Sequence, residues 1–241
     1  MQKYRSVPLL LLPESETWLA SINVRSADFG EGADETFQLL RRFLSAACWA
    51  LPCGVKEWMR GGGDRPNRMG RGRGNRPYIA PKRERAQPIW APEPSDEKAL
   101  LALALFREGR SEQSDVYRFL SFFKVVETVA QGKRSILELI VRHLPEAREG
   151  ARRSTSLNEL NLASDSDLAQ FLYEQCRCAI AHAHSHPLVD PDNSRHTSSI
   201  AEYVPLVQAL ALTIIQREYG IPRWPPRDWS PEWQVVSLSD F

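Results

Sequence analysis

The chain has 241 residues, of which 42% are hydrophobic and 25% charged, and its formal net charge is +1. These values are typical of a soluble globular protein with one good core and room for a small second unit. No apolar run approaches the roughly 20 residues that cross a bilayer, and four cysteines in a chain this long do not make a disulfide framework. We therefore expect a cytoplasmic protein with no membrane partner.

Residues 1–53 are predicted to form a small α+β unit. The apolar run 7–12 is too short for a signal-peptide core and is predicted to be a buried strand. Residues 18–24 alternate as a second strand, and a helix with one apolar side is expected over residues 33–51. This unit carries no pattern that indicates chemistry.

A basic segment rich in Gly, Arg and Pro follows over residues 54–94 and is predicted to be a loop or linker. Residues 60–85 contain nine basic and two acidic residues, a net charge of +7, which leaves −6 for the rest of the chain. Interleaved Arg and Gly fit an arm that follows a polyanionic backbone, although a solvated insertion loop is the alternative. The candidate substrate-binding residues of this arm are Arg68, Arg71, Arg73 and Arg76.

The pattern is helical over residues 95–220. Ser95 and Asp96 offer an N-cap for a helix that runs to about residue 110. Ser114 or Asp115 offers one for a second helix to residue 130, which is apolar nearly all round and should therefore be central or lie in a subunit interface.

A shorter helix over residues 133–144 is expected to end at Pro145, with a polar loop over 145–163. The helix that carries the candidate site begins at residues 164–167. The last long helix spans about 199–219 and ends at Gly220, and the Trp- and Pro-rich tail, residues 221–241, is expected to pack on the surface.

The candidate site is the run Arg177-Cys178-Ala179-Ile180-Ala181-His182. An arginine can grip a phosphate with paired N–H donors, and a histidine can exchange protons near neutral pH, so the two suit phosphodiester chemistry. In a straight α-helix, at about 100° per residue, Arg177 lies opposite the apolar stripe and about 140° from His182. Arg177 and His184 nearly coincide, so His184 is a second candidate for the working base.

Two further residues on the helix over 115–130 are candidates. Lys124 and Glu127 stand three residues apart and form either a pair at the solvent edge or parts of the site, with Lys124 binding substrate and Glu127 orienting Arg177. Cys178, His182 and His186 recur every four residues and make a zinc site conceivable, but paired C-x-x-C spacing is absent. No glycine loop that would cradle a phosphate precedes a helix. We expect no metal and no cofactor.

Two segments resemble a known superfamily. The run "RCAIAHAH" resembles the R-x(4–6)-H signature of the HEPN superfamily, and the upstream "FREGRSEQSDVYRFLSFFKVVETV" resembles the HEPN-like domain of methylamine-utilisation J-type proteins. The resemblance covers about residues 95–219 and does not extend to the N-terminal unit. It implies a mainly α protein whose antiparallel helical bundle dimerises, with motif helices of both subunits meeting in one cleft.

The resemblance also implies a function. Many HEPN proteins are metal-independent endoribonucleases of toxin–antitoxin, CRISPR-associated or phage-defence systems. By this resemblance Arg177 would hold the scissile phosphate and His182 would exchange protons, which leaves a 2′,3′-cyclic phosphate and a 5′-hydroxyl. The implied partners are RNA, a second copy of the chain, and an antitoxin or other defence-system protein.

Two other functions stay open. Active members often have a polar residue after the arginine, where this chain has Cys178, and some HEPN domains are non-catalytic binding or scaffolding modules. RNA binding without cleavage, through the basic arm, is the third interpretation.

Overall fold

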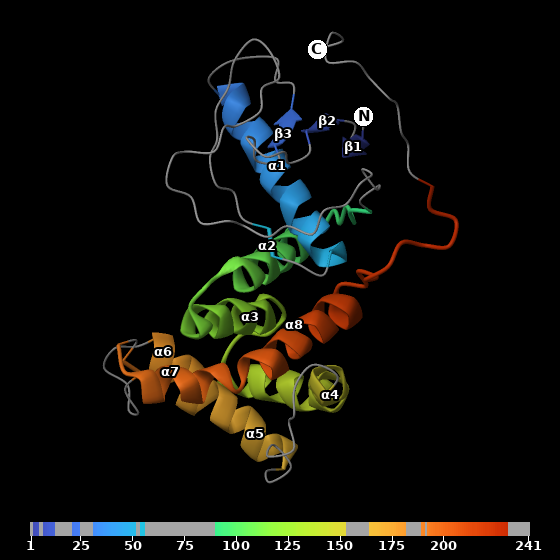
Figure 1. The fold of residues 1–241 in the computed structure, drawn as a ribbon. Coiled ribbons are helices and arrows are strands. Elements are labelled where there is room, and N and C mark those ends of the chain that lie inside the picture. The colour runs from blue at the N-terminus through green and yellow to red at the C-terminus, as the bar shows by residue number, and fades with distance from the viewer. Residues whose placement is uncertain are drawn as a thin grey trace. The chain divides into compact units, whose positions relative to one another are not determined.

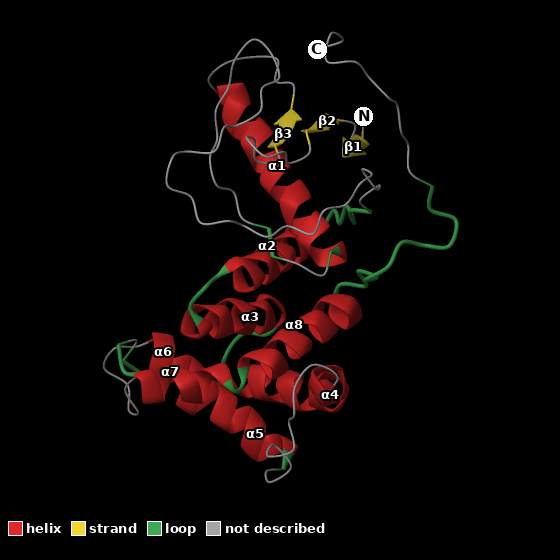
Figure 2. Cartoon of the chain, in the orientation of Figure 1, coloured by secondary structure: helices red, strands yellow, loops and turns green. Residues whose placement is uncertain are grey.

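The structure is a computed structural model that describes residues 2–4, 7–12, 21–24, 31–51, 54–55, 90–152, 164–181, 189–190 and 192–230. The chain divides into two compact units (Figure 1). The first comprises residues 1–50, 57–93 and 224–241, and the second comprises residues 51–56 and 94–223. The described part of the chain is mainly helical, as Figure 2 shows.

Three short strands and one helix are described in the first unit. β1 (Gln2–Tyr4), β2 (Val7–Leu12) and β3 (Ser21–Val24) pair antiparallel in the order β1-β2-β3. α1 (Glu31–Ala50) begins two residues before the position expected from the apolar pattern. Every side chain from residue 43 to residue 49 is buried, so the second half of this helix is covered all round rather than on one side.

The second unit begins with a helical hairpin of α2 (Glu97–Ser111) and α3 (Asp115–Val129). The Asp96 carboxylate accepts a hydrogen bond from the Ala99 N–H at 2.8 Å and so satisfies one of the free donors of the first turn of α2. Ser114 occupies the N-cap position of α3. Both predicted helix starts are confirmed.

α3 lies at the centre of this unit. It packs against α2 and against α8 (Val204–Glu218). Its inward side chains are fully buried, namely Phe119, Phe122, Phe123, Val125 and Val126. The apolar character of most of the helix is therefore explained by a central position within one chain, while Tyr117 near its start is 56% exposed.

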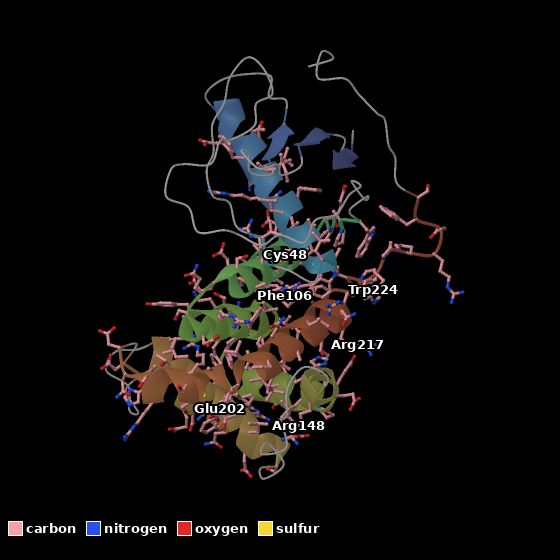
Figure 3. All side chains as sticks on the ribbon, viewed as in Figure 1. Cys48, Phe106, Arg148, Glu202, Arg217 and Trp224 are labelled. Atoms are coloured by element: carbon pink, nitrogen blue, oxygen red, sulfur yellow. The ribbon has the colours of Figure 1, made fainter. Side chains whose placement is uncertain are left out.

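The prediction that Pro145 ends a helix is wrong. α4 (Lys133–Arg152) continues through this proline, although proline lacks an N–H and costs one helical hydrogen bond. Tertiary contacts beyond it hold the extra turns. Ala147 and Ala151 are fully buried, and Glu146 accepts two hydrogen bonds, at 3.0 and 2.9 Å, from Arg217 of α8. Figure 3 labels Arg217 on this helix. The loop expected over 145–163 is thus helical to residue 152, and its remainder lies outside the described residues.

The single helix expected over 199–219 is also wrong. Two helices, α7 (Ser194–Ala201) and α8, meet at an angle of 40°. Pro205 stands in the first turn of α8, where the N–H that proline lacks would have no partner within the helix. Proline also disfavours helical geometry at the residue before it. α8 ends as predicted, before Gly220, whose φ of +64° suits glycine.

Among the described residues no single helix is long and apolar enough to cross a membrane, and only the bent pair α7–α8 meets the requirement by length and composition. Most of the apolar side chains of α8 are buried inside the bundle, as expected for a core helix. In the C-terminal tail, Ile221 is buried and Trp224 is 69% exposed (Figure 3); residues 231–241 lie outside the described residues.

Candidate functional site

The segment that carries Arg177 begins where it was predicted. α5 (Asp165–Phe171) is N-capped by Ser164, whose hydroxyl accepts a hydrogen bond from the Asp167 N–H at 3.2 Å. Arg148 of α4 forms an ion pair with Asp165 at 3.2 Å and so holds the first turn of α5 in place (Figure 3).

The middle of this segment departs from the straight α-helix that was expected. Residues Leu172–Cys178 form a π-helix, η2, which is followed by the short helix α6 (Ala179–Ala181). Backbone bonds in a π-helix join residue i to i+5, so each turn contains more residues than an α-turn, and such segments often lie at functional sites. Angles calculated at 100° per residue therefore do not apply across residues 172–178.

Arg177 lies against α3 rather than in open solvent. Its Nε donates a hydrogen bond to Glu127 Oε1 at 2.7 Å, and its Nη2 is 2.6 Å from the same oxygen. Both side chains are largely covered, with 22% of Arg177 and 24% of Glu127 exposed. The contact needed for Glu127 to orient Arg177 is therefore present, across 50 residues of sequence.

An aromatic ring lies beside this ion pair. The centre of the Arg177 guanidinium is 5.9 Å from the centre of the Tyr173 ring, and Tyr173 in turn packs against Phe123 of α3, with 6.2 Å between ring centres. Tyr173 and Arg177, four residues apart, share one face of η2. That face is directed at α3, and the ring and the carboxylate together restrict the orientation of the guanidinium.

Burial and charge act in opposite directions on Arg177. Burial lowers its pKa, but the charge and hydrogen bonds of Glu127, with a further hydrogen bond to the side chain of Cys178, raise the pKa above its ordinary value. Arg177 is therefore a permanent cation whose charge is matched by the neighbouring carboxylate.

A second ion pair on η2 was not predicted. Lys133, at the start of α4, pairs with Glu174, which also accepts a hydrogen bond from Gln170 at 3.2 Å. The hydrogen bond between Lys133 and Glu174 raises the pKa of Lys133 and lowers that of Glu174. The partners are 41 residues apart, and no local pattern could have indicated the pair. Lys124 is exposed on α3.

Several predicted site residues cannot be placed. His182, His184 and His186 lie outside the described residues, as do Arg68, Arg71, Arg73 and Arg76. Within the described part of the chain, no group of three or more His, Cys, Asp or Glu side chains is arranged to hold a metal ion. The described half of the candidate site is therefore Arg177 with the residues that surround it.

A buried polar group at the far end of α8 was also missed by sequence reasoning. His143 of α4 is 7% exposed, and its Nε2 is 2.7 Å from Oε1 of Glu218. Nearby, Tyr219 donates a hydrogen bond to Thr128, whose hydroxyl donates to the Val125 carbonyl oxygen. Each buried polar atom here has a partner, and these contacts join α3, α4 and α8, so the cluster is best explained as structural.

The two cysteines beside Arg177 should differ in reactivity. Burial raises the pKa of Cys176 to about 12, whereas Cys178 is partly exposed. The thiolate is the reactive form, and even at pH 10 only about 1% of Cys176 would be ionised. We expect iodoacetamide to alkylate Cys178 first and Cys176 only after denaturation, as measured by peptide mass spectrometry between pH 7 and pH 10. Equal labelling of both in the native protein would contradict this.

The comparisons with known proteins concern the bundle alone. A family model described as methylamine utilization protein MauJ matches residues 102–216, just under half of the chain. The matched region runs from within α2 to within α8 and contains both Glu127 and Arg177. No curated protein and no solved structure matches the chain.

Proposed function

We propose that this chain, whose bundle matches the methylamine utilization protein MauJ model, is a HEPN-type RNA endonuclease that works without a metal or cofactor. The observation that carries the proposal is Arg177 itself. This arginine is held in a fixed orientation on a π-helical segment, five residues before the first of the motif's histidines. Permanent cations that are partly shielded from water bind phosphate more strongly than fully hydrated ones.

In this proposal the roles follow from the chemistry of each side chain. Arg177 binds the scissile phosphate and stabilises the charge that develops on it. His182 or His184 takes the proton from the RNA 2′-hydroxyl or returns one to the leaving 5′-oxygen. The attack of the 2′-oxygen on phosphorus breaks the bond to the 5′-oxygen and gives a 2′,3′-cyclic phosphate and a 5′-hydroxyl.

The rest of the proposal concerns partners. A homodimer would bring Arg177 of one subunit close to a histidine of the other, and the basic arm with Arg68, Arg71, Arg73 and Arg76, together with Lys124, would bind the RNA backbone. The setting would be cytoplasmic defence or toxin-like growth control, with an antitoxin or another defence-system protein as regulator.

Cleavage of RNA in the presence of EDTA tests this function. The purified protein is incubated with mixed RNAs and excess EDTA near neutral pH, where histidine can serve as acid or base, and the product ends are analysed. We expect cyclic phosphate ends and loss of cleavage in either His182→Ala or His184→Ala, whichever is the working base. His196→Ala, on α7, is the matched histidine control. Absence of cleavage, or cleavage unchanged in both motif variants, contradicts the proposal.

A non-catalytic binding or scaffolding module is the second candidate, and one observation favours it. Arg177 already has an anionic partner in Glu127, which is what a purely structural ion pair would show. This function predicts a stable complex with another protein, detected by co-purification with the products of neighbouring genes, and tolerance of both histidine substitutions.

A further inference from the structure

Two cations that contact η2 or lie on it, Arg177 and Lys133, are each paired with a carboxylate. Arg177 pairs with Glu127, and Lys133 pairs with Glu174. A surface whose cations are matched in this way has little attraction for a polyanion, because the phosphate must first displace the carboxylate or approach beside it. This is unexpected for a surface that is proposed to grip RNA.

The geometry of the first pair makes the competition direct. Nε and Nη2 form one edge of the guanidinium, and a phosphate binds such an edge with two parallel hydrogen bonds. Both of these donors converge on the single atom Oε1 of Glu127. The Tyr173 ring, whose centre is 5.9 Å from that of the guanidinium, is a further neighbour of Arg177.

From this arrangement we propose that Glu127 is an autoinhibitory residue, which occupies Arg177 in the free protein and must release it when an RNA phosphate binds. The inference rests on the proposed function, because it assigns a regulatory contact to the same arginine. In this role Glu127 competes with substrate for Arg177, so removing its charge should strengthen RNA binding. If Glu127 instead orients Arg177 for substrate, as one interpretation of the sequence holds, removing its charge should weaken binding.

Charge removal at Glu127 separates these roles. Glu127→Gln keeps the shape of the side chain and removes its charge, so the amide oxygen that remains competes less strongly with a phosphate for Arg177. We expect a single-stranded RNA oligonucleotide to bind this variant about fivefold tighter than wild type at low salt, the size expected when a partly exposed ion pair no longer competes. The slope of log affinity against log salt should steepen by about one phosphate contact. A purely structural role would not change this slope.

Two further variants serve as controls. Glu138→Gln breaks an exposed pair with Arg134 on α4 and should leave both binding and slope unchanged. In the double variant Glu127→Gln/Arg177→Ala the gain should disappear, because it depends on Arg177. Thermal unfolding of each variant establishes that the bundle is folded.

The outcomes distinguish this inference from the proposed function. If wild type cleaves RNA in EDTA and Glu127→Gln binds or cleaves no better than wild type, autoinhibition is overturned and the enzyme proposal stands. If neither wild type nor any variant binds or cleaves RNA, the proposed function is overturned and this inference with it. Tighter binding with a steeper salt slope in the single variant alone supports autoinhibition.

Discussion

Phe122→Ala is expected to lower the free energy of unfolding by about 3–5 kcal/mol, the usual cost of deleting a buried aromatic ring. Phe122 is fully buried, and its ring centre is 5.5 Å from that of Phe106 on α2. Gly109 of α2 lies directly against this ring and has no side chain to fill the space that the ring would leave. Urea unfolding followed by circular dichroism measures the change.

A double-mutant cycle with Gly109 tests the reason for this loss. A Cβ at Gly109 would lie 2.7 Å from a Phe122 ring atom, so Gly109→Ala alone should destabilise the hairpin. With Phe122 already alanine, the added methyl group enters vacated space and its cost should fall or change sign. Leu101→Ala, at a position on α2 that is 51% exposed, is the control. An identical cost for Gly109→Ala in both backgrounds would contradict this packing.

Arg177→Ala is expected to reduce single-turnover cleavage of RNA by about 10²–10³-fold, as does the loss of one donor that stabilises transition-state charge in other enzymes. The reason is that alanine offers neither charge nor hydrogen bonds to the scissile phosphate. The cleavage rate of Arg177→Lys should lie between those of wild type and Arg177→Ala, since lysine keeps the charge but cannot reproduce the paired N–H edge. The rate is measured with excess protein over a labelled RNA in EDTA.

Stability must be measured in the same variants. Removal of Arg177 leaves the largely covered Glu127 carboxylate without this partner, so some loss of folding free energy is expected alongside the catalytic loss. Arg134→Ala, which removes a 95% exposed arginine from α4, is the matched control. Wild-type cleavage rates in a folded Arg177→Ala protein would rule out the proposed role.

Helix starts were predictable because they depend on a few adjacent residues. Asp96 and Ser164 accept hydrogen bonds from the first turns of their helices, and this chemistry is local. The glycine after α8 was predictable for the same reason, because a left-handed residue ends a helix wherever it occurs.

Helix interiors and ends that depend on tertiary contacts were not predictable in this way. Pro145 favours a helix end locally, yet buried Ala147 and Ala151 and the Glu146–Arg217 contact keep α4 intact. The break between α7 and α8 is the opposite case, because its cause, Pro205, is local. The apolar pattern runs on through this proline and so predicts one continuous helix.

The candidate site was predicted in part. The sequence offered contact between Glu127 and Arg177 as one of two interpretations of Glu127, the other being a solvent-edge pair with Lys124. It did not predict the Lys133–Glu174 pair, whose partners meet only once α4 and η2 are folded. It could not predict η2 either, since period-based reasoning assumes the same number of residues in every turn.

The wide turns of η2 act as a rotational offset within one continuous helical segment. If the same seven residues wound as an ordinary α-helix, everything after them would be turned by about 100° about the axis, roughly the rotation of one residue, whereas deleting one residue would offset that turn. Homologous chains with identical motif letters and spacing would therefore point those letters in different directions if one wound this segment as a π-helix and the other as an α-helix. Motif spacing along the sequence is for this reason a poor guide to spatial relation here, and the hydrogen-bond pattern of residues 172–178 is the better one.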